Sequence, residues 1–183
     1  MKVKKILILL VVLVMVFSTC VVHAYPMNDF IRVLPALQET NNWCWAACGQ
    51  SVLDYFGRYV SQSDFCEATL GGVYDETTTP YHMRGGFRRY GVDSRVIRSY
   101  LNFDSIKTEI SIRRRPILIG LDFSDRRTKH MVLANGYVMR PTGMDYVSIM
   151  DPAVGRFYLP SYDFLRGGKW YDHSWTITMC DFR

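Results

Sequence analysis

The chain has 183 residues, of which 49% are hydrophobic, 14% aromatic and 21% charged. That composition supplies enough apolar material for one packed core and too little charge for a disordered chain, so we expect a single domain. The formal net charge is +5, but three lysines precede an apolar run near the N-terminus, and the rest of the chain holds 19 Lys and Arg residues against 17 Asp and Glu. This small surplus gives no electrostatic argument for a nucleic-acid-binding protein.

The first 24 residues have the features of a secretory signal peptide. Basic residues at 2–5 precede an unbroken apolar stretch at 6–17, and Val22 and Ala24 place small side chains at the two positions that a signal peptidase inspects. The apolar stretch has 12 residues, whereas a membrane-spanning helix needs roughly 20. Cys20 suggests lipid attachment instead, but the residues before it match that pattern poorly.

We therefore expect cleavage after Ala24 and a mature domain over residues 25–183 that is secreted or periplasmic, without stable membrane association. Disulfides persist in such compartments. The mature chain keeps four cysteines: Cys44, Cys48, Cys66 and Cys180. They allow three pairings, and we favour Cys48 with Cys66, because Cys48 lies one helical turn after Cys44 and can face a neighbouring helix.

Helical patterns occupy the first part of the mature chain. The clearest covers residues 43–56, where small and apolar side chains recur at helical spacing, Asn41 or Asn42 is available as the N-cap, and Gly57 can end the helix. Three further helices are expected: residues 63–70 before Gly71, a helix that begins with Thr79 and Pro80 and ends before Gly91, and residues 105–114 between Asp104 as cap and Pro116.

After Pro116 the pattern changes to β-rich segments separated by turn residues. The expected strands are residues 117–123, 130–139, 146–150, 155–159 and 174–180. Helices followed by strands indicate an α+β fold. The short link after residue 139 predicts an antiparallel hairpin, which brings His130 and Asp151 to the same end. The two face each other directly if the turn centres between Arg140 and Pro141, and a slip of one residue separates them.

The chemistry of a reactive thiol accounts for several of these positions. Cys44 falls in the first turn of the clearest helix, where unpaired N–H groups and the helix dipole stabilise a thiolate. Such a thiol needs a histidine from elsewhere in the fold, and His130 is the best placed, with His173 in reserve. Asp151 can orient the His130 ring, and Gln38, six residues before Cys44, can help to bind an oxyanion.

These segments resemble a known superfamily. Residues 38–47, QETNNWCWAA, resemble the nucleophile segment of papain-like cysteine proteases, in which a Gln and five further residues precede Cys-Trp-Ala. Residues 129–137, KHMVLANGY, are similar to the histidine strand of that superfamily. Residues 148–152, SIMDP, together with Gly155, resemble the Asp-Pro-x-x-Gly segment of its compact bacterial branches, which include bacteriocin-leader-processing and effector-type peptidases.

The resemblance implies a papain-like α+β fold, with the nucleophile on a central helix of an N-terminal helical half and an antiparallel sheet in the C-terminal half. Cys44 would be the nucleophile, His130 the general acid and base, Asp151 the orienting residue and Gln38 the oxyanion donor. The expected function is a secreted cysteine peptidase acting on polypeptides. The paired-glycine preference of the leader-processing peptidases is not carried over, because those domains are normally fused to a transporter.

Two other interpretations stay open at this stage. One is a cell-wall amidase, endopeptidase or acyl transferase that uses the same thiol chemistry. The other is a secreted, non-catalytic binding module that retains the fold, with its active-site groups either without a catalytic role or locked in a disulfide. No cofactor or metal is expected, because the sequence has neither a glycine-rich phosphate loop nor paired Cys or His residues at zinc-site spacing. The oligomeric state is not predicted.

Overall fold

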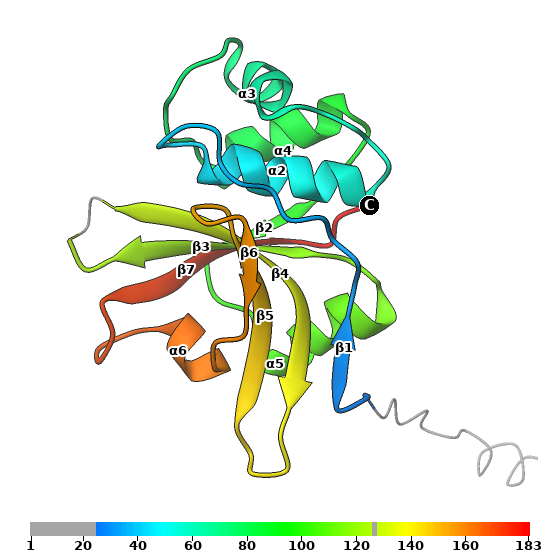
Figure 1. Cartoon of the computed structure of the whole chain (residues 1–183), viewed down its shortest axis with the longest axis vertical. Coiled ribbons are helices and arrows are strands. Elements are labelled where there is room, and N and C mark those ends of the chain that lie inside the picture. The colour runs from blue at the N-terminus through cyan, green and yellow to red at the C-terminus, as the bar shows by residue number, and fades with distance from the viewer. Residues whose placement is uncertain (1–24, 126–127) are drawn as a thin grey trace, which may run out of the picture.

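The computed structural model describes residues 25–125 and 128–183, so the expected signal peptide lies outside the described residues. In Figure 1, three helices, α2, α3 and α4, gather on one side of a twisted antiparallel sheet, and α2 lies nearest to the strands. The N-terminal part of the described chain is mainly helical and the C-terminal part mainly β, which confirms the α+β prediction.

Helix α2, Cys44–Tyr55, matches the clearest helical pattern. Its N-cap residue is Trp43, and no side chain caps it, so the prediction of Asn41 or Asn42 in that place was wrong. The backbone N–H of Asn42 instead donates to the carboxylate of Asp75, at 2.9 Å. The helix ends as expected, because Gly57 adopts a positive φ of 72° that reverses the chain.

The other helices follow their capping signals to different degrees. Helix α3 is Gln62–Leu70 and helix α4 is Pro80–Arg89, with the side chains of Ser61 and Thr79 accepting hydrogen bonds at their starts. The fourth expected helix divides into α5, Phe103–Lys107, and a π-helical turn η1, Thr108–Ile112. Asn102 caps α5 rather than Asp104, since its side chain accepts the N–H of Ser105 at 2.8 Å.

Six strands form the main path of the sheet, in the order β2-β7-β3-β4-β5-β6, and β1 pairs with β4. The strands are β1 Asn28–Phe30, β2 Arg95–Ile97, β3 Ile117–Phe123, β4 Lys129–Met139, β5 Asp145–Asp151, β6 Arg156–Tyr158 and β7 His173–Cys180. All five expected strands are present within two residues of their predicted ends. The sequence pattern missed β1, β2 and helix α6, Tyr162–Arg166, because each is too short to show periodicity.

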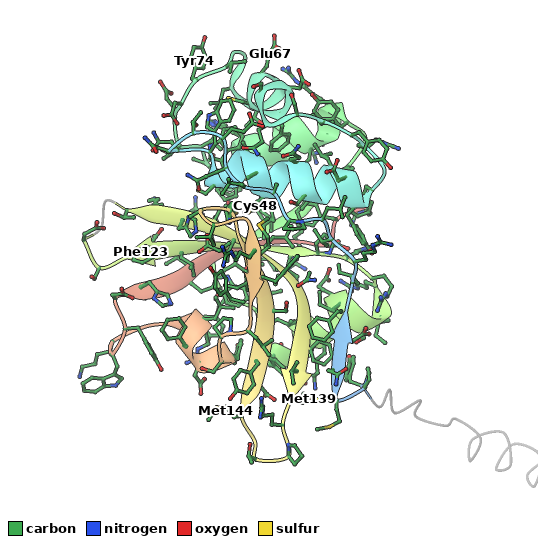
Figure 2. The ribbon with its side chains drawn as sticks, viewed as in Figure 1. Cys48, Glu67, Tyr74, Phe123, Met139 and Met144 are labelled. Atoms are coloured by element: carbon green, nitrogen blue, oxygen red, sulfur yellow. The ribbon has the colours of Figure 1, made fainter. Side chains whose placement is uncertain are left out.

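The β4–β5 hairpin has a different register from the one considered above. Met139 pairs with Asp145, so the turn centres beyond Pro141. The ladder is interrupted between Ala134 and Gly136, where Asn135 is an extra residue on β4. Figure 2 places Met139 and Met144 at the turn end of this hairpin, away from Cys48, which lies where α2 meets the sheet.

The core joins the helices to the sheet through aromatic side chains. Phe65 of α3 is fully buried and contacts Trp45 of α2 and Phe87 of α4, with ring centroids 5.7 and 4.8 Å apart. Phe87 in turn meets Phe182 near the C-terminus at 5.2 Å. Burial of such a side chain stabilises the fold by roughly 1.5–3 kcal/mol. In the described ranges, no helix combines the length and apolar character needed to cross a membrane.

Candidate active site

Four sequence-predicted residues, Gln38, Cys44, His130 and Asp151, line one cleft of about 400 Å³. Cys44 is the first residue of α2, His130 lies near the start of β4, and Asp151 ends β5. Other lining residues are Asn41, Asn42, Thr77, Phe123, Thr128, Lys129 and Ala153. The cleft therefore lies between the N-terminal end of α2 and the adjacent ends of β4 and β5, a position in which the helix dipole can activate a thiol.

His130 and Asp151 are hydrogen-bonded. The Nε2 atom of His130 lies 2.7 Å from Oδ1 of Asp151, and the two side chains are only 19% and 30% exposed. That oxygen also accepts the backbone N–H of Ala153 at 3.0 Å, which fixes the carboxylate. Because Nε2 is bound to the carboxylate, Nδ1 is the ring nitrogen available to the Cys44 thiol.

His130 and Asp151 each stabilise the charged form of the other. Burial lowers the pKa of His130, but hydrogen bonds to Asp151 and Cys44 outweigh it and raise that pKa from 6.5 to about 9. Burial raises the pKa of Asp151, but the hydrogen bond and positive charge of His130 give a net lowering. At neutral pH the arrangement therefore favours an imidazolium next to a carboxylate, with the thiol beside it.

Gln38 is held at the mouth of the cleft by the loop that precedes α2. Its Nε2 donates to the carbonyl oxygens of Thr40 and Asn41, both at 2.9 Å. The buried side chain of Gln62 brackets it: Nε2 donates to the Leu37 carbonyl at 2.8 Å, and Oε1 accepts the N–H of Glu39 at 3.1 Å. Sequence reasoning missed Gln62, because a single polar residue at a helix start carries no signal for such a role.

Asp75 organises the same loop from the other side. Its carboxylate accepts the hydroxyl of Thr40 at 2.6 Å and the N–H of Asn42 at 2.9 Å, and these bonds lower its pKa. Two indole N–H groups also donate to this segment, from Trp43 to the Tyr74 carbonyl at 2.7 Å and from Trp45 to the Glu76 carbonyl at 2.9 Å. Nothing in the local sequence predicted these contacts, because they join residues more than 30 positions apart.

The predicted disulfide between Cys48 and Cys66 is absent from the structure. Cys44, Cys48, Cys66 and Cys180 are all free. The Cys48 thiol donates to the Met131 carbonyl at 3.5 Å, and the Cys66 thiol contacts the carbonyls of Gly72 and Tyr74 at the same distance. Cys48 faces the sheet rather than α3, which explains why the expected pair does not form. Burial, with added repulsion from Cys44 and Asp151, raises the pKa of Cys48 well above its usual value.

His173, the reserve candidate, lies outside the cleft. Its ring is buried and bonds to Asp172 at 2.8 Å and to the Phe164 carbonyl at 3.0 Å. Another cavity of about 410 Å³, between α3 and α4, contains Tyr59, Asp64 and Arg89 but neither a cysteine nor a histidine. Among the residues that the structure describes, no group of three or more His, Cys, Asp or Glu side chains is arranged to bind a metal ion.

The profile of the Peptidase_C39 like family matches residues 30–174, which include every cleft residue named above. The chain belongs to this family. It is accordingly a cysteine-type peptidase with a papain-like fold, which confirms the resemblance seen in its motifs. No curated protein matches the chain.

Several solved peptidase structures share the fold. A double glycine motif protease from an AMS/PCAT transporter, solved with a leader peptide, is 18% identical, with a TM-score of 0.57 over 84% of this chain and 93% of that one. The peptidase domain of Streptococcus ComA is 14% identical, with a TM-score of 0.59 over 81% and 98%. The recombinant stem bromelain precursor is 12% identical, with a TM-score of 0.57 over 90% and 72%.

Proposed function

We propose that this C39-like peptidase is exported and hydrolyses peptide bonds with Cys44 as nucleophile, His130 as general acid and base, Asp151 as the orienting residue and Gln38 as an oxyanion donor. One observation carries the proposal: the His130–Asp151 hydrogen bond of 2.7 Å lies in the same cleft as Cys44 at the start of α2. The pattern of residues 1–24 supports export.

The first half of the reaction forms an acyl-enzyme. Nδ1 of His130 holds the proton of the Cys44 thiol, and the thiolate attacks the carbonyl carbon to form a C–S bond. The negative charge moves to the carbonyl oxygen, which accepts the N–H of Cys44 and one amide N–H of Gln38, released from its bond to the Thr40 or Asn41 carbonyl. His130 then gives its proton to the leaving nitrogen as the C–N bond breaks.

The second half releases the acyl group. His130 is now neutral, so it can take a proton from water as the water oxygen attacks the thioester carbon. The C–S bond breaks, and the proton on His130 returns the site to its starting ion pair. Asp151 keeps its hydrogen bond to Nε2 throughout, so Nδ1 faces the reacting atoms in both halves.

Thiol labelling tests this mechanism. Mature protein treated with iodoacetamide near pH 6 should react at Cys44 far faster than a model thiol, because Cys44 begins α2 and shares the cleft with His130, which can accept the thiol proton. Cys44→Ala should abolish both rapid labelling and cleavage of a peptide library. Cys180→Ala is the matched control, since the Cys180 thiol is buried and its pKa is raised to about 11. Labelling of Cys44 at the rate of a free thiol contradicts the proposal.

Export is tested separately. Expression of the full chain in a bacterial host should yield a secreted or periplasmic protein whose N-terminal residue is Tyr25. A chain that keeps residues 1–24 and stays in the cytoplasm would contradict this part of the proposal, without affecting the assignment of the site.

A further inference from the structure

The interruption in the β4–β5 ladder lies between the hairpin turn and the active site. On the turn side, Gly136 pairs with Ser148, and on the site side Ala134 pairs with Ile149 and Leu133 with Met150. Asn135 is therefore an extra residue on β4 that is not paired with a β5 residue in the backbone ladder. Such β-bulges change which face of a strand a side chain occupies and recur beside active sites.

The bulge decides which side chain Asp151 can meet. If the ladder continued from Gly136 and Ser148 without interruption, Asp151 would lie opposite Leu133, on the face of the hairpin that His130 does not share. With the bulge, Asp151 falls opposite Val132, two residues from His130 and therefore on the same face. The two side chains then meet diagonally, at the observed 2.7 Å.

Asn135 has contacts that hold this irregular geometry. Its backbone carbonyl accepts the N–H of Ile31 at 2.8 Å, and its Nδ2 donates to the Ile31 carbonyl at 3.0 Å. Its Oδ1 accepts the hydroxyl of Ser148, on β5, at 2.7 Å. Asn135 and Ser148 are only 8% and 6% exposed, so both hydrogen-bonding groups depend on each other rather than on water.

We propose that Asn135 is a positioning residue, which holds the β4 bulge and so places Asp151 on the face of the hairpin that carries His130. The inference rests on the proposed catalytic function of that pair. The strand pairing set by the hairpin turn does not by itself align the site. If that pairing continued along the strands without the bulge, Asp151 would lie opposite Leu133. Asn135 shifts this pairing by one residue, and it is held there because it donates to the Ile31 carbonyl and accepts the Ser148 hydroxyl.

The test uses a double-mutant cycle between Asn135→Val and Asp151→Asn in the mature enzyme. Valine removes both side-chain hydrogen bonds and favours regular pairing. Each single variant should lower kcat/KM by about 100-fold, mainly through kcat, because the imidazole loses its alignment. The double variant should be no worse than either single one, since both changes remove the same interaction. Losses that multiply would overturn the inference.

A readout that needs no catalysis distinguishes the two proposals. NMR titration of the His130 ring should show its pKa falling in both Asp151→Asn and Asn135→Val, relative to the wild type. If the His130 pKa in Asn135→Val equals that of the wild type while it falls in Asp151→Asn, Asn135 does not have the proposed role, and the proposed function is unaffected. An unshifted titration in Asp151→Asn refutes the proposed pair itself, and the inference with it.

Two more variants separate alignment from stability. Val92→Ala removes a buried side chain outside the hairpin and should lower stability without moving the His130 titration. If Asn135→Val does not fold, Ser148→Ala replaces it in both measurements, because it removes only the hydroxyl that holds Oδ1. It should shift the titration in the same direction by less, and no shift at all counts against the proposal.

Discussion

The backbone N–H of Gln38 donates a hydrogen bond of 2.8 Å to the carbonyl oxygen of Pro152. The segment that leads to the nucleophile is thereby fastened to the turn that follows Asp151. Gly155 allows the two segments to approach this closely, because an added Cβ there would lie 3.1 Å from Cβ of Leu37. The helical and β parts of the molecule are thus joined directly at one end of the cleft, and the proposed oxyanion donor depends on that junction.

Gln38→Ala should lower kcat by about 10²–10³-fold with little change in KM, the cost seen when one oxyanion donor is lost. Steady-state kinetics on a peptide substrate measure this. The rate of Cys44 alkylation should change little, because the thiolate does not depend on the amide. A variant with full kcat would remove Gln38 from the mechanism.

Asp75→Ala should lower kcat/KM by about tenfold, since the loop of Thr40 and Asn42 loses its shared acceptor and the amide of Gln38 loses its fixed support. Asp75→Asn retains an acceptor oxygen and should recover most of the activity. The comparison of these two variants is the measurement. Equal activities of Asp75→Ala and the wild type would mean that the other contacts suffice to hold the loop.

Stability should depend on pH through His130. Its pKa in the folded protein, about 9, lies above the ordinary 6.5, so the charged ring contributes full stability below about pH 6.5 and loses that contribution as the pH rises through 9. Melting temperatures across this range should fall more steeply for the wild type than for Asp151→Asn. Parallel curves would show that the carboxylate does not stabilise the imidazolium.

All four described cysteines are free, so a reducing agent should not change the stability of the folded protein. Titration with a thiol reagent should find one fast thiol under native conditions, and the slow ones should react only after denaturation, because Cys48, Cys66 and Cys180 are buried. Equal melting temperatures with and without dithiothreitol are expected. A large drop on reduction would require a disulfide that the structure does not contain.

Gly155→Ala should destabilise the fold by about 1–2 kcal/mol, because Gly155 has a φ of 64°, which costs an L-residue strain, and the new methyl group meets Leu37. Urea unfolding measures the loss. Gly143→Ala, at a φ of 80° with nothing near its Cβ, is the matched control for backbone strain alone. The difference between the two variants reports the contact with Leu37, and a difference of zero would mean that Leu37 moves aside freely.

Local signals predicted the parts of the fold that depend on local physics. The start of α4 after Thr79, the stops at Gly57 and Gly71, and the strand from Ile117 are set by capping, glycine conformation and β-propensity within a few residues. The catalytic candidates came from spacing and resemblance, and the structure brings them into one cleft.

Long-range contacts explain what the sequence could not predict. The loop before α2 is held by Gln62 and Asp75, which are 23 to 35 residues away from their partners. The hairpin register depended on an extra residue at Asn135, whose bonds to Ile31 and Ser148 are set by tertiary packing. The disulfide prediction failed because cysteine spacing does not show which face of α2 Cys48 occupies.

The sheet ends on both sides in strands of three residues, β2 and β6. An edge this short offers another chain few unpaired N–H and C=O groups as a template. We therefore expect the folded protein to resist amyloid-like stacking when it is concentrated, and any insoluble material to arise from unfolded chains that expose the longer inner strands.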